Sequence, residues 1–260
     1  MDLDLKDRTV LVTGGAKGIG EAVTRALAAE GALPVVVDRD REAGEALRTE
    51  LDASGARSAL VVADLMEPGA CRRAVEEALG VTGRLDAVVN NAGVNDRVSL
   101  EEGTVEDFVR SLRRNLIHYF EIAQYALPAL KETRGAIVNV SSKVAMTGQG
   151  GTSGYAASKG GILALTREWA VDLAPAGVRV NAVVPAEVMT PLYRQWLGTF
   201  PDPDEKLADI VRRVPLGRRM TTPEEIAAVV LFLLSPRSGH TTGQYLFADG
   251  GYVHLDRAIT

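Results

Sequence analysis

Short apolar runs rich in β-branched residues alternate along this chain with longer stretches in which apolar positions recur every three or four residues. The runs are almost continuously apolar, which is typical of strands covered by helices on both faces of a parallel sheet. Seven runs have this pattern: 9–13, 33–38, 58–64, 85–90, 136–141, 178–184 and 244–249. The stretch 19–31 is typical of the helices between them, and Gly31 is placed to end it.

This alternation predicts a doubly wound α/β fold, because a strand, a crossover helix and a parallel strand form a right-handed unit. No linker rich in proline, glycine or serine divides the 260 residues. We therefore expect one Rossmann-like domain over 1–260 with a seven-stranded parallel sheet.

Two segments interrupt the pattern. Residues 186–215 are rich in proline and carry aromatic side chains, and such a long irregular segment is more often a binding loop than a defect. We interpret it as a substrate lid. The tail 252–260 continues past the last apolar run and has two open interpretations. It is either a frayed terminus or a segment that closes the active site of a neighbouring subunit.

Composition narrows the class of protein. The net charge of −5, from 29 basic and 34 acidic residues, offers no basic surface for nucleic acid or an anionic membrane. Cys71 is the single cysteine, which fits a reducing compartment, and we expect a cytoplasmic protein. The three histidines are far apart in the sequence, so we expect no metal site.

A glycine-rich turn follows the first apolar run, in the sequence TGGAKGIG. Glycines at 14, 18 and 20 would let the backbone approach a pyrophosphate, and the helix that follows would offer free N–H groups and its positive dipole end. Tight packing of a strand against a helix would require similar glycines. The turn alone therefore leaves both interpretations open.

Acidic residues at the ends of the second and third runs favour a nucleotide. Asp38 is placed to accept both hydroxyls of an adenosine ribose, although it could instead cap the next helix, as Asp40 could. Asp64 is placed to accept from the adenine amino group. Because ligands bind beyond the carboxyl ends of parallel strands, these positions predict a dinucleotide site.

The same stretch bears on the choice of cofactor. A carboxylate at Asp38 repels a 2′-phosphate, which favours NAD. Lys17 and Arg39 could pair with such a phosphate, so NADP stays possible.

Tyr155 and Lys159 are four residues apart and therefore lie on one face of a predicted helix. They could be a tyrosine ring packed on a surface lysine. A tyrosine with a pKa of ~10 is a poor base near neutrality, but a cation within roughly 4–6 Å lowers the pKa by about 1–3 units. We expect Lys159 to lower the pKa of Tyr155, so that Tyr155 takes the proton when an alcohol loses a hydride.

Several motifs occur together in a fixed order: TGGAKGIG, NNAG at 90–93, Asn115, the serine pair 141–142, YAASK at 155–159 and the proline and threonine of 185–190. As a set they resemble the short-chain dehydrogenase/reductase family from about residue 5 to residue 251. The resemblance implies a Rossmann-like fold, a nicotinamide cofactor and a homotetramer. The implied catalytic residues are Asn115, Ser142, Tyr155 and Lys159.

The resemblance also implies the roles of these residues. In the family the serine binds the substrate oxygen, the lysine also binds the nicotinamide ribose, and the asparagine holds a water that links the lysine to solvent. The implied cofactor-binding residues are Gly14, Lys17, Gly18, Ile19, Gly20, Asp38, Arg39, Asp64, Leu65, Asn90, Asn91, Ala92, Gly93, Tyr155, Lys159, Pro185, Val188 and Thr190. The chain departs from the family where Ala186 replaces the glycine that usually follows the proline, and Glu187 beside it is unusual.

The lid mixes carboxylate, amide and aromatic side chains, which suits a sugar. Stretches such as NNAGVND, TGQGGTSGY and VPAEVMTPLYRQW are similar to the L-fucose dehydrogenases, a group within the family. That resemblance implies oxidation of an unphosphorylated aldose at the anomeric carbon to a lactone. The candidate sugar contacts are Asn95, Ser142, Lys143, Gln149, Glu187 and Trp196, and Trp196 could instead pack the lid.

Other substrates stay open, because this fold handles polyols, steroids and keto-acyl groups as well as sugars. A regulator that senses a dinucleotide without turnover is also possible, but such proteins typically lose the tyrosine or the lysine. A nucleotide-sugar epimerase would normally carry a larger C-terminal domain.

Overall fold

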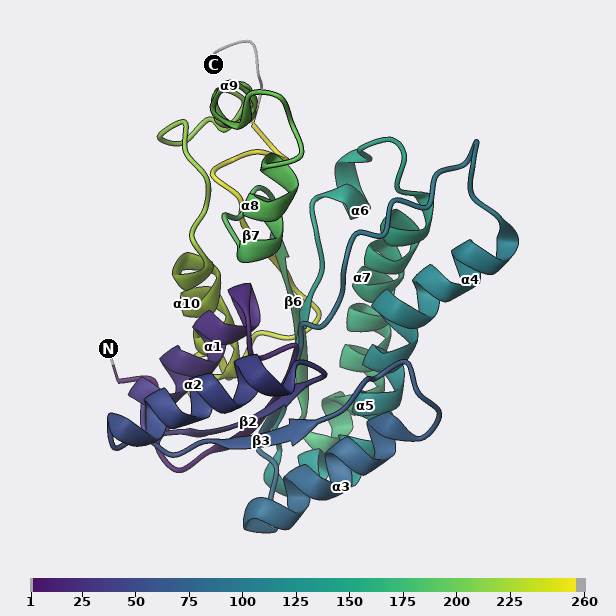
Figure 1. The fold of residues 1–260 in the computed structure, drawn as a ribbon. Helices are drawn as coiled ribbons and strands as arrows, with labels where there is room; N and C mark the ends of the chain where they lie inside the picture. The colour runs from purple at the N-terminus through teal and green to yellow at the C-terminus, as the bar shows by residue number, and fades with distance from the viewer. Residues whose placement is uncertain (1, 256–260) are drawn as a thin grey trace.

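The computed structural model describes residues 2–255. They form a Rossmann-like α/β domain around one sheet of seven parallel strands in the order β3-β2-β1-β4-β5-β6-β7 (Figure 1). The strands are β1 Thr9–Thr13, β2 Leu33–Asp38, β3 Ala59–Val62, β4 Ala87–Asn90, β5 Ala136–Val140, β6 Arg179–Pro185 and β7 Tyr245–Ala248. All the predicted strands are confirmed, with ends that differ by at most two residues.

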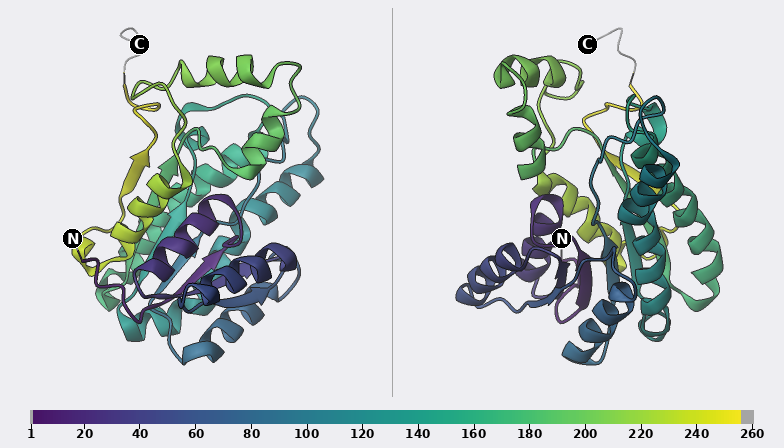
Figure 2. Two further views of the ribbon diagram at one scale, coloured as in Figure 1. Left: turned by 60° about the vertical axis from the view of Figure 1, so that its left-hand side comes forward. Right: turned by 45° about the vertical axis from the view of Figure 1, so that its right-hand side comes forward.

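Helices cover both faces of the sheet (Figures 1 and 2). One face is covered by α1 Gly18–Ala29, α2 Arg41–Ala53 and α10 Pro223–Leu234, and the other by α3 Ala70–Thr82, α4 Val105–Leu112, α5 His118–Thr133 and α7 Ser153–Leu173. Successive strand residues serve opposite layers, since Val12 packs in the core with α1 and α10 while Leu11 packs in the core with α3 and α5. This explains why the strands read as unbroken apolar runs.

The strand order reverses between β1 and β4, where the chain stops winding in one direction and starts in the other. The loops that follow these two strands meet, because the side-chain amide of Asn91 donates to the carbonyl oxygens of Thr13 at 3.0 Å and Gly14 at 3.1 Å. Ligands of doubly wound sheets bind at such a point.

The lid interpreted from the sequence contains two helices, α8 Pro191–Leu197 and α9 Pro203–Val211, near the carboxyl ends of β6 and β7 (Figure 2). Thr190 and Asp202 each accept a backbone hydrogen bond from the first turn of the helix that follows. In both cases proline occupies the first helical position, where its missing N–H costs nothing.

Short elements complete the structure: α6 Val144–Thr147, a π-helical turn at Arg113–Ile117, and 3₁₀ turns at Ala174–Ala176 and Pro236–Ser238. Among residues 2–255, no helix has the length and apolar character needed to cross a bilayer. The same residues contain no cluster of three histidine, cysteine or acidic side chains that could hold a metal.

Candidate active site

The turn between β1 and α1 requires glycine. Gly14 and Gly18 have φ values of +62° and +58°, which favour glycine. A Cβ atom at Gly20 would lie 1.9 Å from the carbonyl oxygen of Gly14. No side chain caps the first turn of α1, so its N–H groups and dipole face the space beyond β1. This is the arrangement that binds a pyrophosphate.

Asp38, the last residue of β2, and Asp40, two residues later, have different roles in the structure. Asp40 caps α2 by accepting from the N–H of Ala43 at 3.0 Å, and it pairs with Lys17 at 2.5 Å. Asp38 accepts from the N–H of Ala16 at 3.1 Å and from that of Asp40 at 3.0 Å. Asp38 therefore fixes the glycine turn and lies at the strand end where a ribose would bind, while Lys17 already has a partner in Asp40.

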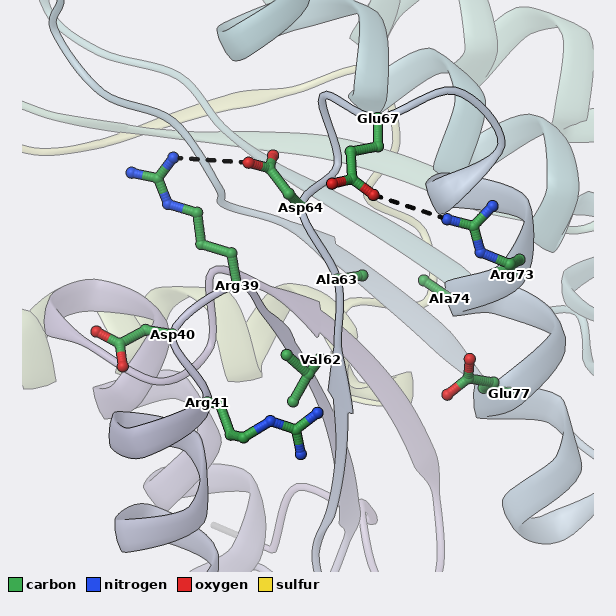
Figure 3. Close-up of a pocket in the computed structure, with 10 residues that line it drawn as sticks. All are labelled: Arg39, Asp40, Arg41, Val62, Ala63, Asp64, Glu67, Arg73, Ala74 and Glu77. Carbon is green, nitrogen blue, oxygen red and sulfur yellow. Dashed lines mark ion pairs between the residues drawn. The ribbon is translucent and has the colours of Figure 1, made fainter.

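A charged hollow of about 710 Å³ lies at the outer edge of the sheet, beside β3 (Figure 3). Arg39 and Asp64 line it and approach each other at 3.9 Å. The hollow lies at the carboxyl ends of β2 and β3, and strands β1 and β4 lie between it and β5, the strand that precedes Tyr155 in the chain. The hollow therefore lies at the predicted nucleotide-binding end of the site, away from the predicted catalytic residues.

The stretch after β4 passes close to the catalytic side chains. A Cβ atom at Gly93 would lie 2.9 Å from Oδ1 of Asn115 and 3.7 Å from Nζ of Lys159. Asn90 instead lies inside the sheet, where its buried amide donates to Asn139 at 3.0 Å. Ile19 and Leu65 are partly buried against the two layers of the core.

Asn115 lies in the π-helical turn between α4 and α5. The residue is fully buried, and its Oδ1 accepts from the N–H of Val94 at 2.7 Å while Nδ2 donates to the carbonyl oxygen of Ser111 at 3.1 Å. Isolated π turns occur frequently at functional sites. The helix is therefore irregular where this side chain turns toward the loop after β4.

Tyr155 and Lys159 lie on one face of α7, with Nζ of Lys159 5.6 Å from the centre of the tyrosine ring. Lys159 is 3% exposed, and its Nζ donates to the carbonyl oxygen of Val140 at 2.8 Å and to the hydroxyl of Tyr119 at 3.2 Å. It does not reach solvent, so the surface interpretation of this pair is wrong.

The expected effect of Lys159 on Tyr155 is also wrong for the chain alone. Burial raises the pKa of Tyr155 to about 12, although a hydrogen bond with Ser142 lowers it. Burial likewise lowers the pKa of Lys159 to about 7. Desolvation disfavours the charged form of each side chain. The hydrogen bond places Ser142 at the phenol.

The predicted nicotinamide end is formed where the lid begins. Val188 is buried and bridges to Thr221, and its carbonyl oxygen accepts from the N–H of Thr190 at 2.9 Å. A Cβ atom at Gly18 would lie 3.3 Å from the methyl group of Thr190. The glycine turn and the lid entrance are therefore neighbours despite their separation in the sequence, and Pro185 ends β6 just before them.

The candidate sugar contacts fall into two groups. Lys143 and Glu187 form a buried ion pair, and Glu187 also accepts from the hydroxyl of Tyr193 at 2.7 Å. Trp196 packs between Tyr193 and Phe200 in edge-to-face contacts of 5.1 and 4.9 Å, as the lid-packing interpretation expects.

The other two candidates lie on loops. Asn95 accepts from the N–H of Arg97 at 3.2 Å, and Gln149 lies exposed on the loop before α7.

Three residues near the site were not among the predicted site residues. The hydroxyl of Tyr119 contacts Lys159, Asp96 raises the pKa of Tyr155, and Tyr193 binds Glu187. Tyr119 follows Asn115 by one helical turn, which was a usable signal. Asp96 and Tyr193 lie in loop and lid segments, where sequence spacing does not reveal side-chain contacts.

The described part of the tail packs on its own subunit. The ring of Tyr252 lies 4.0 Å from Nζ of Lys143, and His254 packs against Phe247 at 4.3 Å. Residues 256–260 lie outside the described residues. Contact of the tail with a neighbouring subunit therefore stays a prediction.

A family model described as Enoyl-(Acyl carrier protein) reductase matches residues 14–253. The 3-oxoacyl-acyl-carrier-protein reductase FabG of Thermotoga maritima is 36% identical, over 96% of this chain and 99% of that protein. The L-fucose dehydrogenase of Oryctolagus cuniculus is 38% identical, over 94% of this chain and 84% of that protein. The crystal structure of Cj0485 dehydrogenase has a TM-score of 0.94 and 44% identity, covering 99% of this chain and 98% of that one.

Fold and relatives together define an oxidoreductase that acts on CH–OH groups. The chain belongs to the short-chain dehydrogenase/reductase family. Members of this family use NAD or NADP. The residues present fit such a dinucleotide, since the glycine turn leaves an uncapped helix N-terminus and the space at Gly93 excludes a side chain.

Proposed function

We propose that this protein oxidises an unphosphorylated aldose such as L-fucose at its anomeric carbon, giving the lactone. The observation that carries the chemistry is the grouping of Ser142, Tyr155 and Lys159 at the ends of β5 and α7. The sugar assignment is supported by polar and aromatic side chains that connect Ser142 to the lid. Lys143 follows Ser142 in the chain and pairs with Glu187 in the lid. Glu187 in turn accepts from Tyr193, whose ring packs on Trp196.

The names of several relatives support a sugar. Besides the L-fucose dehydrogenases, they include the probable galactose dehydrogenase of Rhizobium meliloti, 37% identical, and the aldohexose dehydrogenase of Thermoplasma acidophilum, 29% identical. The FabG relative is as similar as these, so a keto-acyl substrate is the alternative to be tested beside the sugars.

In the proposed reaction, the C–H bond at the anomeric carbon and the O–H bond of its hydroxyl both break, and a C=O bond forms. The bound dinucleotide would supply the hydride acceptor. Tyr155 takes the hydroxyl proton, and Ser142 donates a hydrogen bond to the same oxygen as negative charge develops on it. Lys159, one turn along α7, stabilises the phenolate as it forms.

We propose NAD as the preferred cofactor. Asp38 is held at the end of β2 by two backbone N–H groups, and its charge would repel a 2′-phosphate. Lys17, the obvious partner for that phosphate, pairs with Asp40. Replacing Asp38 by Asn should raise the ratio of NADP to NAD kcat/KM about tenfold or more, because removing one charge repulsion of this kind is worth over about 1 kcal/mol. An unchanged ratio contradicts this assignment.

The proposed function is tested by following reduced nicotinamide with L-fucose, D-arabinose and L-galactose, beside cyclohexanol, a polyol, a steroid and a 3-hydroxyacyl thioester. We expect turnover with the aldoses, and a Tyr155→Phe loss of about 10²–10⁴-fold in kcat with the nucleotide Kd retained. Turnover of the thioester and of no aldose would contradict the sugar assignment and indicate an acyl substrate.

We also propose that the protein is located in the cytoplasm, which fits the free, buried Cys71.

A further inference from the structure

Lys143, Glu187 and Tyr193 form a polar group that we call the lid cluster. Lys143 and Glu187 are 8% and 9% exposed and pair through Oε1 of Glu187, while Oε2 accepts from the hydroxyl of Tyr193 at 2.7 Å. The three residues come from the segment after β5, the segment after β6, and α8. The cluster therefore joins the lid to the carboxyl end of the sheet.

The burial of this pair is unusual for the molecule. Among the ion pairs within residues 2–255, it is the one in which both side chains are nearly buried, at 10% and 11% exposure. Desolvating two charges often costs more than their attraction returns, so a buried pair contributes little to stability. Stability alone is thus a weak reason for placing these charges here.

The position of the lid cluster points to the reaction. Lys143 follows Ser142 directly, and its backbone N–H donates to the carbonyl oxygen of Pro185 at 2.9 Å. From Tyr193 the contact continues along the lid through the ring of Trp196. The ring of Tyr252 lies over Nζ of Lys143 at 4.0 Å. A movement of α8 would therefore be transmitted to the residue beside the catalytic serine.

We propose that the lid cluster selects substrates that carry hydroxyl groups beside the reacting carbon, an inference that rests on the proposed function. Each carboxylate oxygen of Glu187 has one bond within the cluster and keeps acceptor capacity for a sugar hydroxyl. An alcohol without such hydroxyls would displace water from the carboxylate of Glu187 without forming a hydrogen bond in its place. Sites built to bond a hydroxyl discriminate strongly against analogues that lack it.

The test uses the double variant Lys143→Met, Glu187→Gln, which leaves no unpaired buried charge and keeps an acceptor for Tyr193. We expect kcat/KM for L-fucose to fall about 10- to 100-fold, mainly through KM, because a hydrogen bond to a charged group is lost. The loss for cyclohexanol should be several-fold smaller, since that substrate makes no such bond. Glu76→Gln, which removes an exposed ion pair with Arg72 on α3, outside the lid, is the matched control and should change neither value.

A second measurement tests the cluster without a sugar. Trypsin should cut the lid of the double variant several-fold faster than that of the wild type, because α8 has lost its attachment, while Glu76→Gln on α3 stays at the wild-type rate. Equal losses for L-fucose and cyclohexanol, or an unchanged ratio, overturn the selection role. Unchanged lid cleavage overturns the attachment. A wild-type enzyme that oxidises no aldose overturns the proposed function, and the cleavage rates still decide whether the cluster holds the lid.

Discussion

At the scale of single residues, the site shows how burial competes with charge proximity. The i,i+4 spacing places Lys159 beside Tyr155, and elementary electrostatics predicts a more acidic phenol. In the folded chain burial has the larger effect and moves the pKa of each residue toward its neutral form. Sequence spacing predicted which residues meet, whereas the balance of desolvation depends on how tightly α5, α7 and β5 enclose them.

The first residue-scale prediction concerns stability. Lys159 has a folded pKa of about 7, well below its ordinary 10.5, so its burial destabilises the protein fully below pH 7 and progressively less as pH rises toward 10.5. Lys159→Met should therefore raise the free energy of unfolding by a few kcal/mol at pH 6, at about 1.4 kcal/mol per pKa unit. Urea unfolding at pH 6 and pH 9.5 measures this, and a gain that does not shrink at the higher pH contradicts it.

The second concerns the pH profile. Asp96 accepts from the hydroxyl of Ser111 at 2.8 Å and lies 3.7 Å from Arg114, and its charge raises the pKa of Tyr155. Asp96→Asn keeps an acceptor for Ser111 but removes the charge, so Tyr155 should ionise at lower pH. The rise of kcat/KM for oxidation should then shift to lower pH by a fraction of a unit, because one charge interaction with Tyr155 is removed. Ser111→Ala, which spares the carboxylate, should leave the midpoint in place.

At the scale of elements, alternating runs predicted every strand, because a strand buried on both faces has a distinctive apolar pattern. Helices α8 and α9 were not predicted, since prolines that read as interruptions lie at their first positions. A helix irregularity at Asn115 was one interpretation of the sequence, and the structure has a π turn there. Asn115 accepts a hydrogen bond from Val94, in a loop that only the sheet brings near.

The glycine turn gives the element-scale prediction. Gly20→Ala would place a methyl group 1.9 Å from the carbonyl oxygen of Gly14, so backbone must shift. We expect a loss of about 1–3 kcal/mol in unfolding free energy, as for overpacked sites, together with loss of nucleotide binding. Gly80→Ala in α3 is the control, because nothing lies within 4 Å of its Cβ position. It should stabilise by about 0.5–1 kcal/mol, and thermal unfolding with and without NAD separates the two cases.

At the scale of the whole molecule, the outer surface still carries apolar side chains. Phe120 and Val171 are 46% and 74% exposed on α5 and α7, where the described chain does not cover them. The family resemblance implies a homotetramer, and sedimentation should therefore give four times the 27.7 kDa chain mass. Phe120→Lys with Val171→Glu should lower that mass if these helices form an interface. A monomeric wild type contradicts the prediction.

The contact between Gly18 and Thr190 has a consequence for synthesis. β1 and the glycine turn are synthesised early. Thr190, which lies against that turn, is available only after residue 190 has left the ribosome. A ligand stabilises only the state that binds it, so NAD cannot rescue a stalled or truncated chain that ends before β6. Cellular nucleotide levels should accordingly govern the lifetime of the finished protein and leave the yield of early intermediates unaffected.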